Sequence, residues 1–233
     1  MTVQNAIALR PAMTSPRVRS ETHFAEGFNF YKCFWIFLIG SFYGFVVETI
    51  FCLAKNGYLA YRSNILFTPL NTVYGLGALL LYICLYKIKN NIPLLFVVGT
   101  VAGTVVEYLC SWVQQMAFGS VSWDYSHLPL NINGRVCLLY SVFWGLLAIA
   151  WAKFLQPALD KSIAKIPDKI GRPLTWILFT SIAIVAVLTI VAVVRWNLRT
   201  NGIEASYQLT MWVDHRFPDT YMQNVFNNLK FVS

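Results

Sequence analysis

The sequence predicts an all-α, polytopic integral membrane protein with five transmembrane helices. Of its 233 residues, 57% are hydrophobic and only 12% are charged, whereas globular proteins average about 25% charged residues. The apolar residues gather in five blocks near the length of about 20 residues that crosses a bilayer. Lipid cannot satisfy exposed backbone polar groups, and the alternation typical of a membrane barrel is absent, so we expect the blocks to be helices.

The five apolar blocks follow one another with short polar connections. In chain order they are Phe30–Leu53, Ile65–Tyr86, Pro93–Phe118, Val136–Leu155 and Leu174–Val194. The second and fifth contain no charged residue, while the first and third each contain one glutamate, Glu48 and Glu107.

The distribution of Lys and Arg predicts the orientation. The N-terminal tail with Lys32, the Lys87/Lys89 connection and the segment Lys153–Arg172 together hold eleven of the 18 basic residues, and the opposite side holds seven. The positive-inside rule therefore predicts a multi-pass cell-membrane protein with its N-terminus inside and its C-terminus outside.

We divide the chain into four segments. Residues 1–29 form a cytoplasmic tail expected to be disordered, and residues 30–155 form a duplicated four-helix membrane core. Residues 156–195 hold a basic cytoplasmic loop and the fifth helix, and residues 196–233 form an extracytoplasmic tail with a short amphipathic helix. The apolar residues of that helix are Tyr221, Met222, Val225, Phe226 and Leu229. Its apolar side either lies on the membrane surface or packs on the outer loops.

An internal duplication relates the first two blocks to the third and fourth. The pattern G-x3-G-x3-E occurs as Gly40, Gly44 and Glu48 and, 59 residues later, as Gly99, Gly103 and Glu107. The segment Pro69-Leu70-Asn71 matches Pro129-Leu130-Asn131 at an offset of 60, and Gly75 then matches Gly134. Each half contains two spans, so both halves enter the membrane from the same side and form a parallel repeat about an axis along the membrane normal.

The two glutamates are the leading candidates for a binding site. Glycines four residues apart allow helices to approach closely, and a glutamate four residues further lies on the same helix face. An ionisable residue inside a membrane is costly and is a functional-site hypothesis by default. The structural alternative is that Glu48 and Glu107 are neutral, hydrogen-bonded packing residues.

Further polar residues are expected in the same outer layer of the bundle as the two carboxylates. They are Arg62, Asn71, Tyr74, Asp124, Tyr125, Asn131, Asn133 and Arg135. We expect Arg135 or Arg62 to lie close enough to compensate at least one carboxylate, because an unpaired buried charge is expensive. Asp124 has the alternative role of capping a turn with its own backbone. Trp112, Trp123, Trp144 and Trp151 fit an interfacial aromatic belt.

Several function classes are disfavoured. The net charge of +8 arises from residues between apolar blocks, so no nucleic-acid partner is expected. The five cysteines lack C-x-x-C spacing, none of the three histidines lies in a span, and no metal or cofactor is expected. The chain contains no G-x4-G-K-[ST] loop, so it does not itself hydrolyse nucleotide, and no H-E-x-x-H or G-x-S-x-G motif.

Over residues 30–155 the sequence resembles the bacterial CmpB-type family of ABC-transporter type IV membrane proteins. The motifs that carry the resemblance are Gly44–Glu48, Pro69–Gly77, Glu107-Tyr108, Trp123–Ser126 and Asn133–Arg135. The resemblance implies a permease-like role in the bacterial plasma membrane and a nucleotide-binding ATPase subunit supplied in trans. Of the cytoplasmic connections, only Lys153–Arg172 is long enough to dock such a partner.

Three functions remain open at the level of sequence. The first is a transporter component for a small solute or a lipid-linked substrate, in which Glu48 and Glu107 bind a cation or a coupling proton. A homodimer is one of the assemblies considered for it. The second is a membrane-embedded enzyme acting on a lipid or isoprenoid, with one glutamate as general acid. The third is a non-catalytic scaffold or regulatory subunit.

Overall fold

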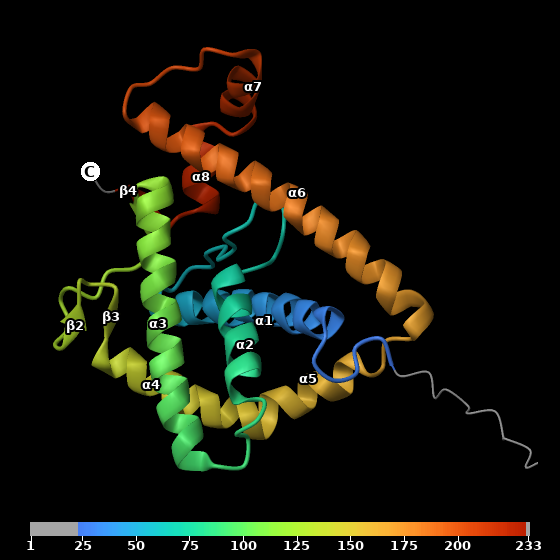
Figure 1. The fold of residues 1–233 in the computed structure, drawn as a ribbon. Helices are drawn as coiled ribbons and strands as arrows, with labels where there is room; N and C mark the ends of the chain where they lie inside the picture. Colours follow the sequence, from blue (N-terminus) through green and yellow to red (C-terminus); the bar gives the residue numbers. More distant parts are fainter. Residues whose placement is uncertain (1–22, 232–233) are drawn as a thin grey trace, which may run out of the picture.

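The computed structural model describes residues 23–231, and it is dominated by helices (Figure 1). The helices are α1 (Phe30–Asn56), α2 (Thr72–Leu85), α3 (Ile92–Phe118), α4 (Leu138–Ala150), α5 (Gln156–Ile163), α6 (Asp168–Thr200), α7 (Gln208–Arg216) and α8 (Asp219–Val225). A π-helical turn, η1 (Trp151–Leu155), joins α4 to α5. Short strands β1 (Ser120–Val121) and β4 (Lys230–Phe231) pair with each other, as do β2 (Asn131–Ile132) and β3 (Val136–Cys137).

Helices α1 and α3 begin and end by the same local chemistry. The side chain of Asn29 accepts a hydrogen bond from the Lys32 backbone N–H at 2.9 Å, and that of Asn91 accepts one from Leu94 at 3.1 Å. These bonds satisfy N–H groups that the first helical turn leaves free. Each helix ends at a glycine with positive φ, Gly57 at 75° and Gly119 at 58°, as is common at helix C-termini.

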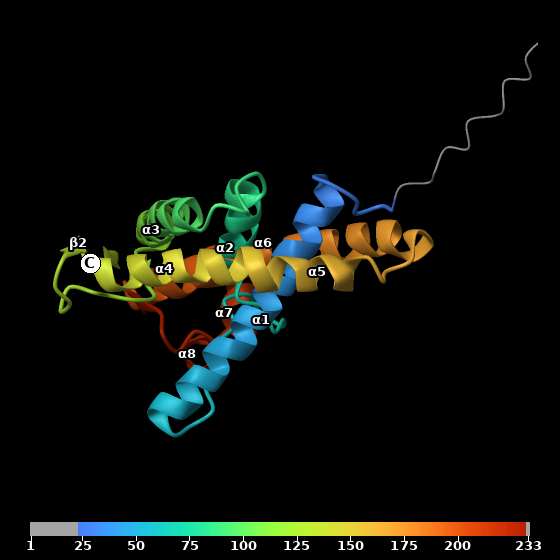
Figure 2. The same ribbon diagram turned by 90° about the horizontal axis from the view of Figure 1, so that it is seen from below.

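The helices cross in pairs. Helix α1 packs across α2, and α3 packs across α4, while α2 and α3 lie side by side (Figures 1 and 2). The segments α4, η1 and α5 form one continuous rod, and the long helix α6 runs diagonally past α1 and α3 (Figure 1).

Four helical segments of the described chain are long and apolar enough to cross a membrane: Phe30–Lys55, Ile92–Phe118, Leu138–Ile163 and Asp168–Thr200. Helix α2, within the predicted block Ile65–Tyr86, has only 14 residues because the first part of that block is irregular. Pro69 lacks a backbone N–H, and the Asn64 side chain accepts the Thr72 N–H at 2.8 Å where the helix begins. Hydropathy alone does not separate such a buried loop from a helix.

Of residues 1–29, for which disorder is expected, residues 1–22 lie outside the described residues, and residues 23–29 contact the start of α6. Phe24 is buried and packs against Gly171 at the start of α6. Its backbone N–H donates to the Asp168 carboxylate at 2.5 Å. An aromatic side chain that fills the space beside a glycine holds this segment in place.

The predicted basic loop that starts at residue 156 is also corrected, because α5 continues the helix to Ile163 and only residues 164–167 separate it from α6. Ile163 is fully buried, and Asp160 forms an ion pair with Lys32 at 2.6 Å. These contacts tie the polar continuation of the helix to the start of α1.

The tail after α6 packs against the rest of the described chain. Met222 and Phe226 are buried together with Trp196 and Leu66 in a second apolar cluster. Strand β4 adds to β1 directly after α3. Of the two interpretations of the amphipathic segment, burial of its apolar side favours the packed one.

Candidate functional site: two carboxylate centres

Glycines allow α1 and α2 to touch closely beside Glu48. A β-carbon added at Gly40 would lie 2.7 Å from that of Ala78, and one added at Gly44 would lie 2.2 Å from that of Tyr74. Since real β-carbons do not approach other atoms this closely, only glycine fits at both positions. The close approach brings the Tyr74 side chain beside the carboxylate one turn further along α1.

The crossing of α3 and α4 uses the same arrangement beside Glu107. A β-carbon added at Gly99 would lie 2.1 Å from that of Ala148, and one added at Gly103 would lie 2.3 Å from the Trp144 ring. Trp144 therefore takes the place in this crossing that Tyr74 takes in the other.

A further pair of glycines, on α2 and α4, bears on the sequence alignment of the second helices. The nearest side chains are Phe37 and Ser41 for Gly75, and Phe96 and Thr100 for Gly145. These neighbours are 59 residues apart, as are Glu48 and Glu107, whereas the two glycines are 70 residues apart. By contacts, Gly75 therefore resembles Gly145, whereas Gly134, its predicted match, lies in the turn of the hairpin before α4.

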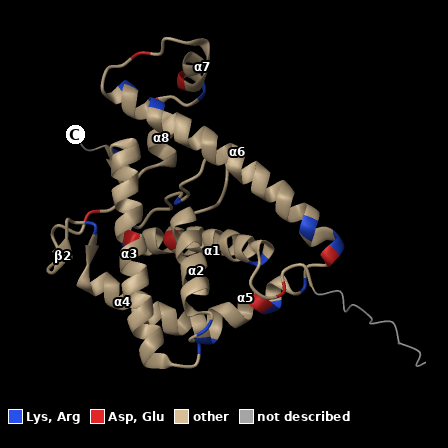
Figure 3. Ribbon diagram, viewed as in Figure 1, with Lys and Arg blue, Asp and Glu red and all other residues tan. Residues whose placement is uncertain are grey.

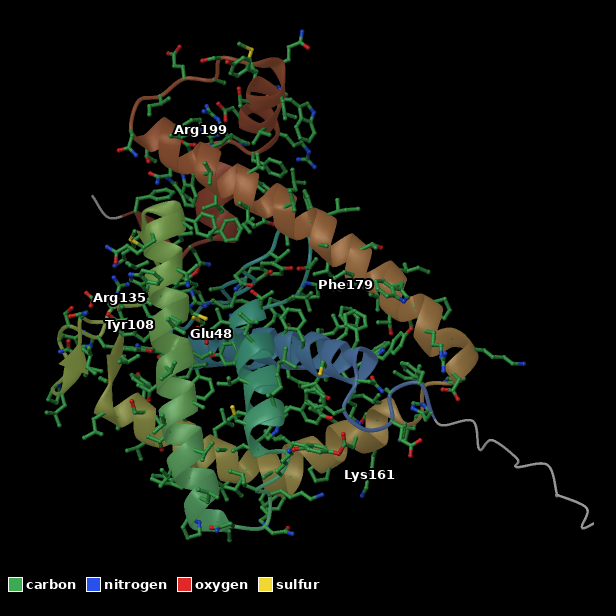
Figure 4. The ribbon with its side chains drawn as sticks, viewed as in Figure 1. Glu48, Tyr108, Arg135, Lys161, Phe179 and Arg199 are labelled. Carbon is green, nitrogen blue, oxygen red and sulfur yellow. The ribbon has the colours of Figure 1, made fainter. Side chains whose placement is uncertain are left out.

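Glu48, which Figure 4 labels, is held by an arginine and a tyrosine. Arg62, in the connection after α1, donates from Nη2 to Glu48 Oε1 at 2.8 Å, and the Tyr74 hydroxyl donates to Oε2 at 2.5 Å. The other terminal nitrogen of Arg62 donates to the Asn227 side chain of the tail at 2.9 Å. The charged side chains are only 16% and 21% exposed, so this is a largely buried, compensated ion pair.

Glu107 receives two uncharged donors. The Tyr125 hydroxyl donates to Oε1 at 2.9 Å, and the Trp144 indole N–H donates to Oε2 at 3.0 Å. The residue is only 9% exposed. Trp144 had been predicted as a belt residue; its N–H faces a carboxylate instead, because the gap at Gly103 admits the indole ring.

The two centres differ in charge compensation. Among residues 23–231, no ion pair includes Glu107. Burial and the neighbouring Glu107 carboxylate raise the pKa of Tyr125, so its hydroxyl stays protonated and remains a donor. A buried carboxyl group without a neighbouring cation is suited to take up a proton or to bind an incoming cation, because burial disfavours its uncompensated charge.

Among residues 23–231, Arg135 forms no ion pair with either glutamate. It donates to the Ser111 hydroxyl at 3.2 Å and to the Gln115 side chain, and its guanidinium lies 5.7 Å from the centre of the Tyr108 ring. The hairpin formed by β2 and β3 directs it toward the last turns of α3. Of the two arginines expected to compensate a carboxylate, Arg62 therefore does so, by its ion pair with Glu48.

Two predicted site residues organise the first connection and the turn after Trp123. Asn71 precedes α2, donates its backbone N–H to the Ser41 carbonyl at 3.0 Å and donates its side-chain amide to the Arg62 carbonyl at 3.3 Å. Asp124 accepts from the Ser126 backbone and hydroxyl at 2.9 and 2.6 Å, which is the turn-capping alternative. The Ser126 hydrogen bonds lower the pKa of Asp124.

The remaining two lie in the hairpin. Asn131 accepts from the Gly134 N–H at 3.1 Å and donates to the Leu128 carbonyl at 2.8 Å, so it stabilises the loop. Asn133 donates to the Tyr108 hydroxyl at 2.9 Å. Within residues 23–231, no group of three or more His, Cys, Asp or Glu side chains is placed to hold a metal ion.

Spanning helices with buried carboxylates define a multi-pass, α-helical membrane protein. The chain belongs to the family described as Putative ABC-transporter type IV, whose sequence model matches residues 35–190. This confirms the resemblance inferred from the sequence motifs. No curated protein and no solved structure matches the chain. The family and the apolar helices together indicate a membrane component of a transporter.

Proposed function

We propose that the chain is the permease-like component of a transporter in which Glu107 takes up a cation or a coupling proton, while Glu48 is held in place by its ion pair. The observation that carries the proposal is the contrast between the two carboxylates. Glu48 is compensated by Arg62, whereas buried Glu107 has only the neutral donors Tyr125 and Trp144. The missing cation is then supplied by the transported species or by protonation.

A parallel two-half organisation of the core is part of this proposal. Its support is the correspondence of contacts: Gly40 with Ala78 corresponds to Gly99 with Ala148, and Tyr74 with Glu48 corresponds to Trp144 with Glu107. In each half, one donor comes from the connection and the other from the following helix. An alternating opening of two such halves would expose a carboxylate near their contact to either side.

We further propose five crossings, with α2 as the shortest. Its 14 residues extend about 21 Å, less than a bilayer core. In the irregular segment before it, Ile65, Leu66 and Leu70 are buried, and the Leu66 backbone N–H donates to the Thr189 hydroxyl of α6 at 3.1 Å. Irregular backbone at membrane depth is tolerated when it is enclosed in this way.

The orientation proposed has the N-terminus inside. Basic residues of α5, of the start of α6 and of the turn between α2 and α3 lie toward the lower and right-hand side of the molecule, where α1 begins (Figure 3). An ATPase subunit would dock on this side, where Lys161, Lys165, Lys169 and Arg172 are concentrated.

The carboxylates are tested with dicyclohexylcarbodiimide, an apolar reagent that modifies protonated carboxyl groups. In purified full-length protein we expect labelling of Glu107 and little labelling of ion-paired Glu48, measured by peptide mass spectrometry. Arg62→Gln is the matched variant, because it should make Glu48 reactive. Preferential labelling of Glu48 in the unaltered protein would contradict the proposed roles.

Transport itself is tested in proteoliposomes with a pH- or Na⁺-sensitive dye trapped inside. We expect an ion flux that Glu107→Gln abolishes and that Val101→Ala, on the exposed side of the same helix, leaves intact. A flux that survives Glu107→Gln would remove this carboxylate from the transport path.

A further inference from the structure

Three hydrogen-bond donors converge on α3 next to Glu107, and no hydrogen bond or ion pair in residues 23–231 joins them to either glutamate. They belong to Arg135, Tyr108 and Asn133; Figure 4 shows Arg135 and Tyr108 together between α3 and the hairpin. The Arg135 guanidinium lies over the Tyr108 ring, and the Asn133 amide reaches the Tyr108 hydroxyl at 2.9 Å. The three groups therefore form one cluster.

The cluster has more donors than acceptors. Of the five N–H groups of Arg135, one is directed at the Ser111 hydroxyl and one at the Gln115 amide oxygen, both uncharged. Its Nε is buried and has no partner within the described chain. Tyr108 accepts the hydrogen bond from Asn133, so its own hydroxyl hydrogen remains available. In residues 23–231, Arg135 forms no ion pair, whereas Arg62, Arg195 and Arg199 each pair with a carboxylate.

The sequence fixes this position through a tight turn. Asn133 and Gly134 have φ values of 54° and 67°, and the Arg135 N–H donates to the Ile132 carbonyl at 3.0 Å. Asn-Gly is the preferred pair for a hairpin turn with two positive φ angles. The Trp123 indole N–H then holds the Arg135 carbonyl at 2.9 Å.

An apolar groove adjoins the cationic cluster on the same hairpin. It consists of two neighbouring cavities of about 290 and 420 Å³ that share Leu130 and Leu138. One of the two extends along Val136 and Cys137, directly after Arg135, and the other extends toward Leu139 and Val142 on α4. Leu130 is 72% exposed, so the groove is open to its surroundings.

The cluster lies along the last three turns of the spanning helix α3, which includes Tyr108. Ser111 and Gln115, which contact Arg135, lie about 10 and 5 Å before the end of the spanning helix α3. The neighbouring Trp112 is 46% exposed, and exposed tryptophans at helix ends are typical of the membrane interface. A cation at this level, next to an open apolar groove, complements a phosphate joined to an acyl chain.

We propose that the hairpin between β2 and β3 forms a binding site for a phospholipid. Arg135, Tyr108 and Asn133 donate hydrogen bonds to its phosphate, and an acyl chain occupies the groove beside Leu130 and Leu138. The three donors are not among the hydrogen-bond partners of Glu48 or Glu107 in the described chain, so the site does not depend on the roles proposed for the two glutamates. Its phosphate supplies the negative charge that the protein does not place beside Arg135.

The test is native mass spectrometry of the full-length protein in detergent, titrated with dioleoylphosphatidylglycerol. We expect Arg135→Gln to weaken binding about tenfold, and Tyr108→Phe and Asn133→Gly about threefold each. Glycine retains the positive φ at position 133 while removing the amide. Arg216→Gln is the matched control, because Arg216 also lies over aromatic rings, those of Phe67 and Phe217, but on another surface; its loss should leave binding unchanged.

Two further ligands separate the contributions. Dioleoylglycerol, which lacks the phosphate, and inorganic phosphate, which lacks the chains, should both bind more weakly than the phospholipid. Equal losses in Arg135→Gln and Arg216→Gln, equal binding of dioleoylglycerol, or equal binding of inorganic phosphate would each overturn the site. If Arg135→Gln does not accumulate in the membrane, Tyr108→Phe and Asn133→Gly decide, and unchanged binding in both would refute the proposal.

Discussion

Glu48 and Glu107 stand at the same position of two similar helix crossings, yet their surroundings differ in one charge. Each carboxylate accepts a hydrogen bond from an aromatic residue of the next helix, Tyr74 or Trp144. The donor from the connection is a cation for Glu48 and a phenol for Glu107. One scaffold thus holds a compensated carboxylate and an uncompensated one.

This difference indicates that the position of each carboxylate and its charge compensation are determined by different parts of the chain. The glycines fix how closely the helices approach, and hence where each carboxylate lies. The connection, which the membrane constrains less, supplies the group that determines whether the carboxylate remains charged. Variants that alter either the glycines or the donor from the connection therefore test the two contributions one at a time.

The largest expected effect is on the compensated centre. Arg62→Gln leaves Glu48 without its cation and should lower the free energy of unfolding in mixed micelles by about 3 kcal/mol. Adding Glu48→Gln should restore part of that loss, because the uncompensated charge is then gone. Strictly additive effects of the two substitutions would show that the ion pair does not couple them.

The two crossings should respond alike to overpacking. Gly44→Ala and Gly103→Ala push a methyl group into Tyr74 or Trp144, and each should cost about 1 to 2 kcal/mol despite the better helix propensity of alanine. Thermal unfolding measures the loss, with Val101→Ala on the exposed face of α3 as the control. A large effect at one glycine and none at the other would break the correspondence.

A smaller effect on stability is expected at the uncompensated centre. Glu107→Gln retains an oxygen that accepts from Trp144, and the Tyr125 hydroxyl is able to reorient, so unfolding should change by less than about 1 kcal/mol. A loss as large as that of Arg62→Gln would mean that Glu107 is ionised and structurally required.

Acid should release the tail from α6, and the tail contacts the Glu48 centre through Asn227. Hydrogen bonds from Arg195 and Arg199 lower the pKa of Asp214 in α7. Docking of the tail is therefore favoured above the usual Asp pKa of about 3.9 and is lost as the pH falls through the lowered folded value. Hydrogen exchange of residues 208–231, corrected for the chemical rate, should stay constant from pH 7 to 5 and rise below about pH 4. In Asp214→Asn the fast exchange should already be present at pH 7.

Much of the helical framework follows from hydropathy and end signals, because spanning helices must be apolar and close their own hydrogen bonds. α1 and α3 begin and end within a few residues of the predicted blocks. Hydropathy gave no way to separate buried Leu66, in an irregular segment, from a residue of a spanning helix. It also placed a loop at the polar residues after Leu155, where a helix supported by Asp160 and Ile163 continues.

The charged residues of the candidate site could be predicted from the sequence, because charge is costly in a membrane, but the aromatic partner Trp144 could not. Glu48 and Glu107 stand out in apolar blocks, and Arg62 was one of two expected partners. Trp144 and its indole N–H were assigned to the interface because a tryptophan in an apolar run carries no sign of its partner. The sequence does contain one indication of this partner, because Trp144 precedes Gly145 as Tyr74 precedes Gly75. Matching Gly75 to Gly134, which is 59 rather than 70 residues away, concealed that similarity.

The contact between Asn227 and Arg62 also orders the maturation of the protein. Residues 219–231 leave the ribosome after every spanning helix, yet they bind a side chain of the first connection and add a strand next to α3. The Arg62–Glu48 ion pair thus joins residues that are made early, whereas the Asn227 contact to Arg62 can form only after residue 227 is made. A nascent chain stalled before residue 219 would contain α1 to α6 but would lack this contact.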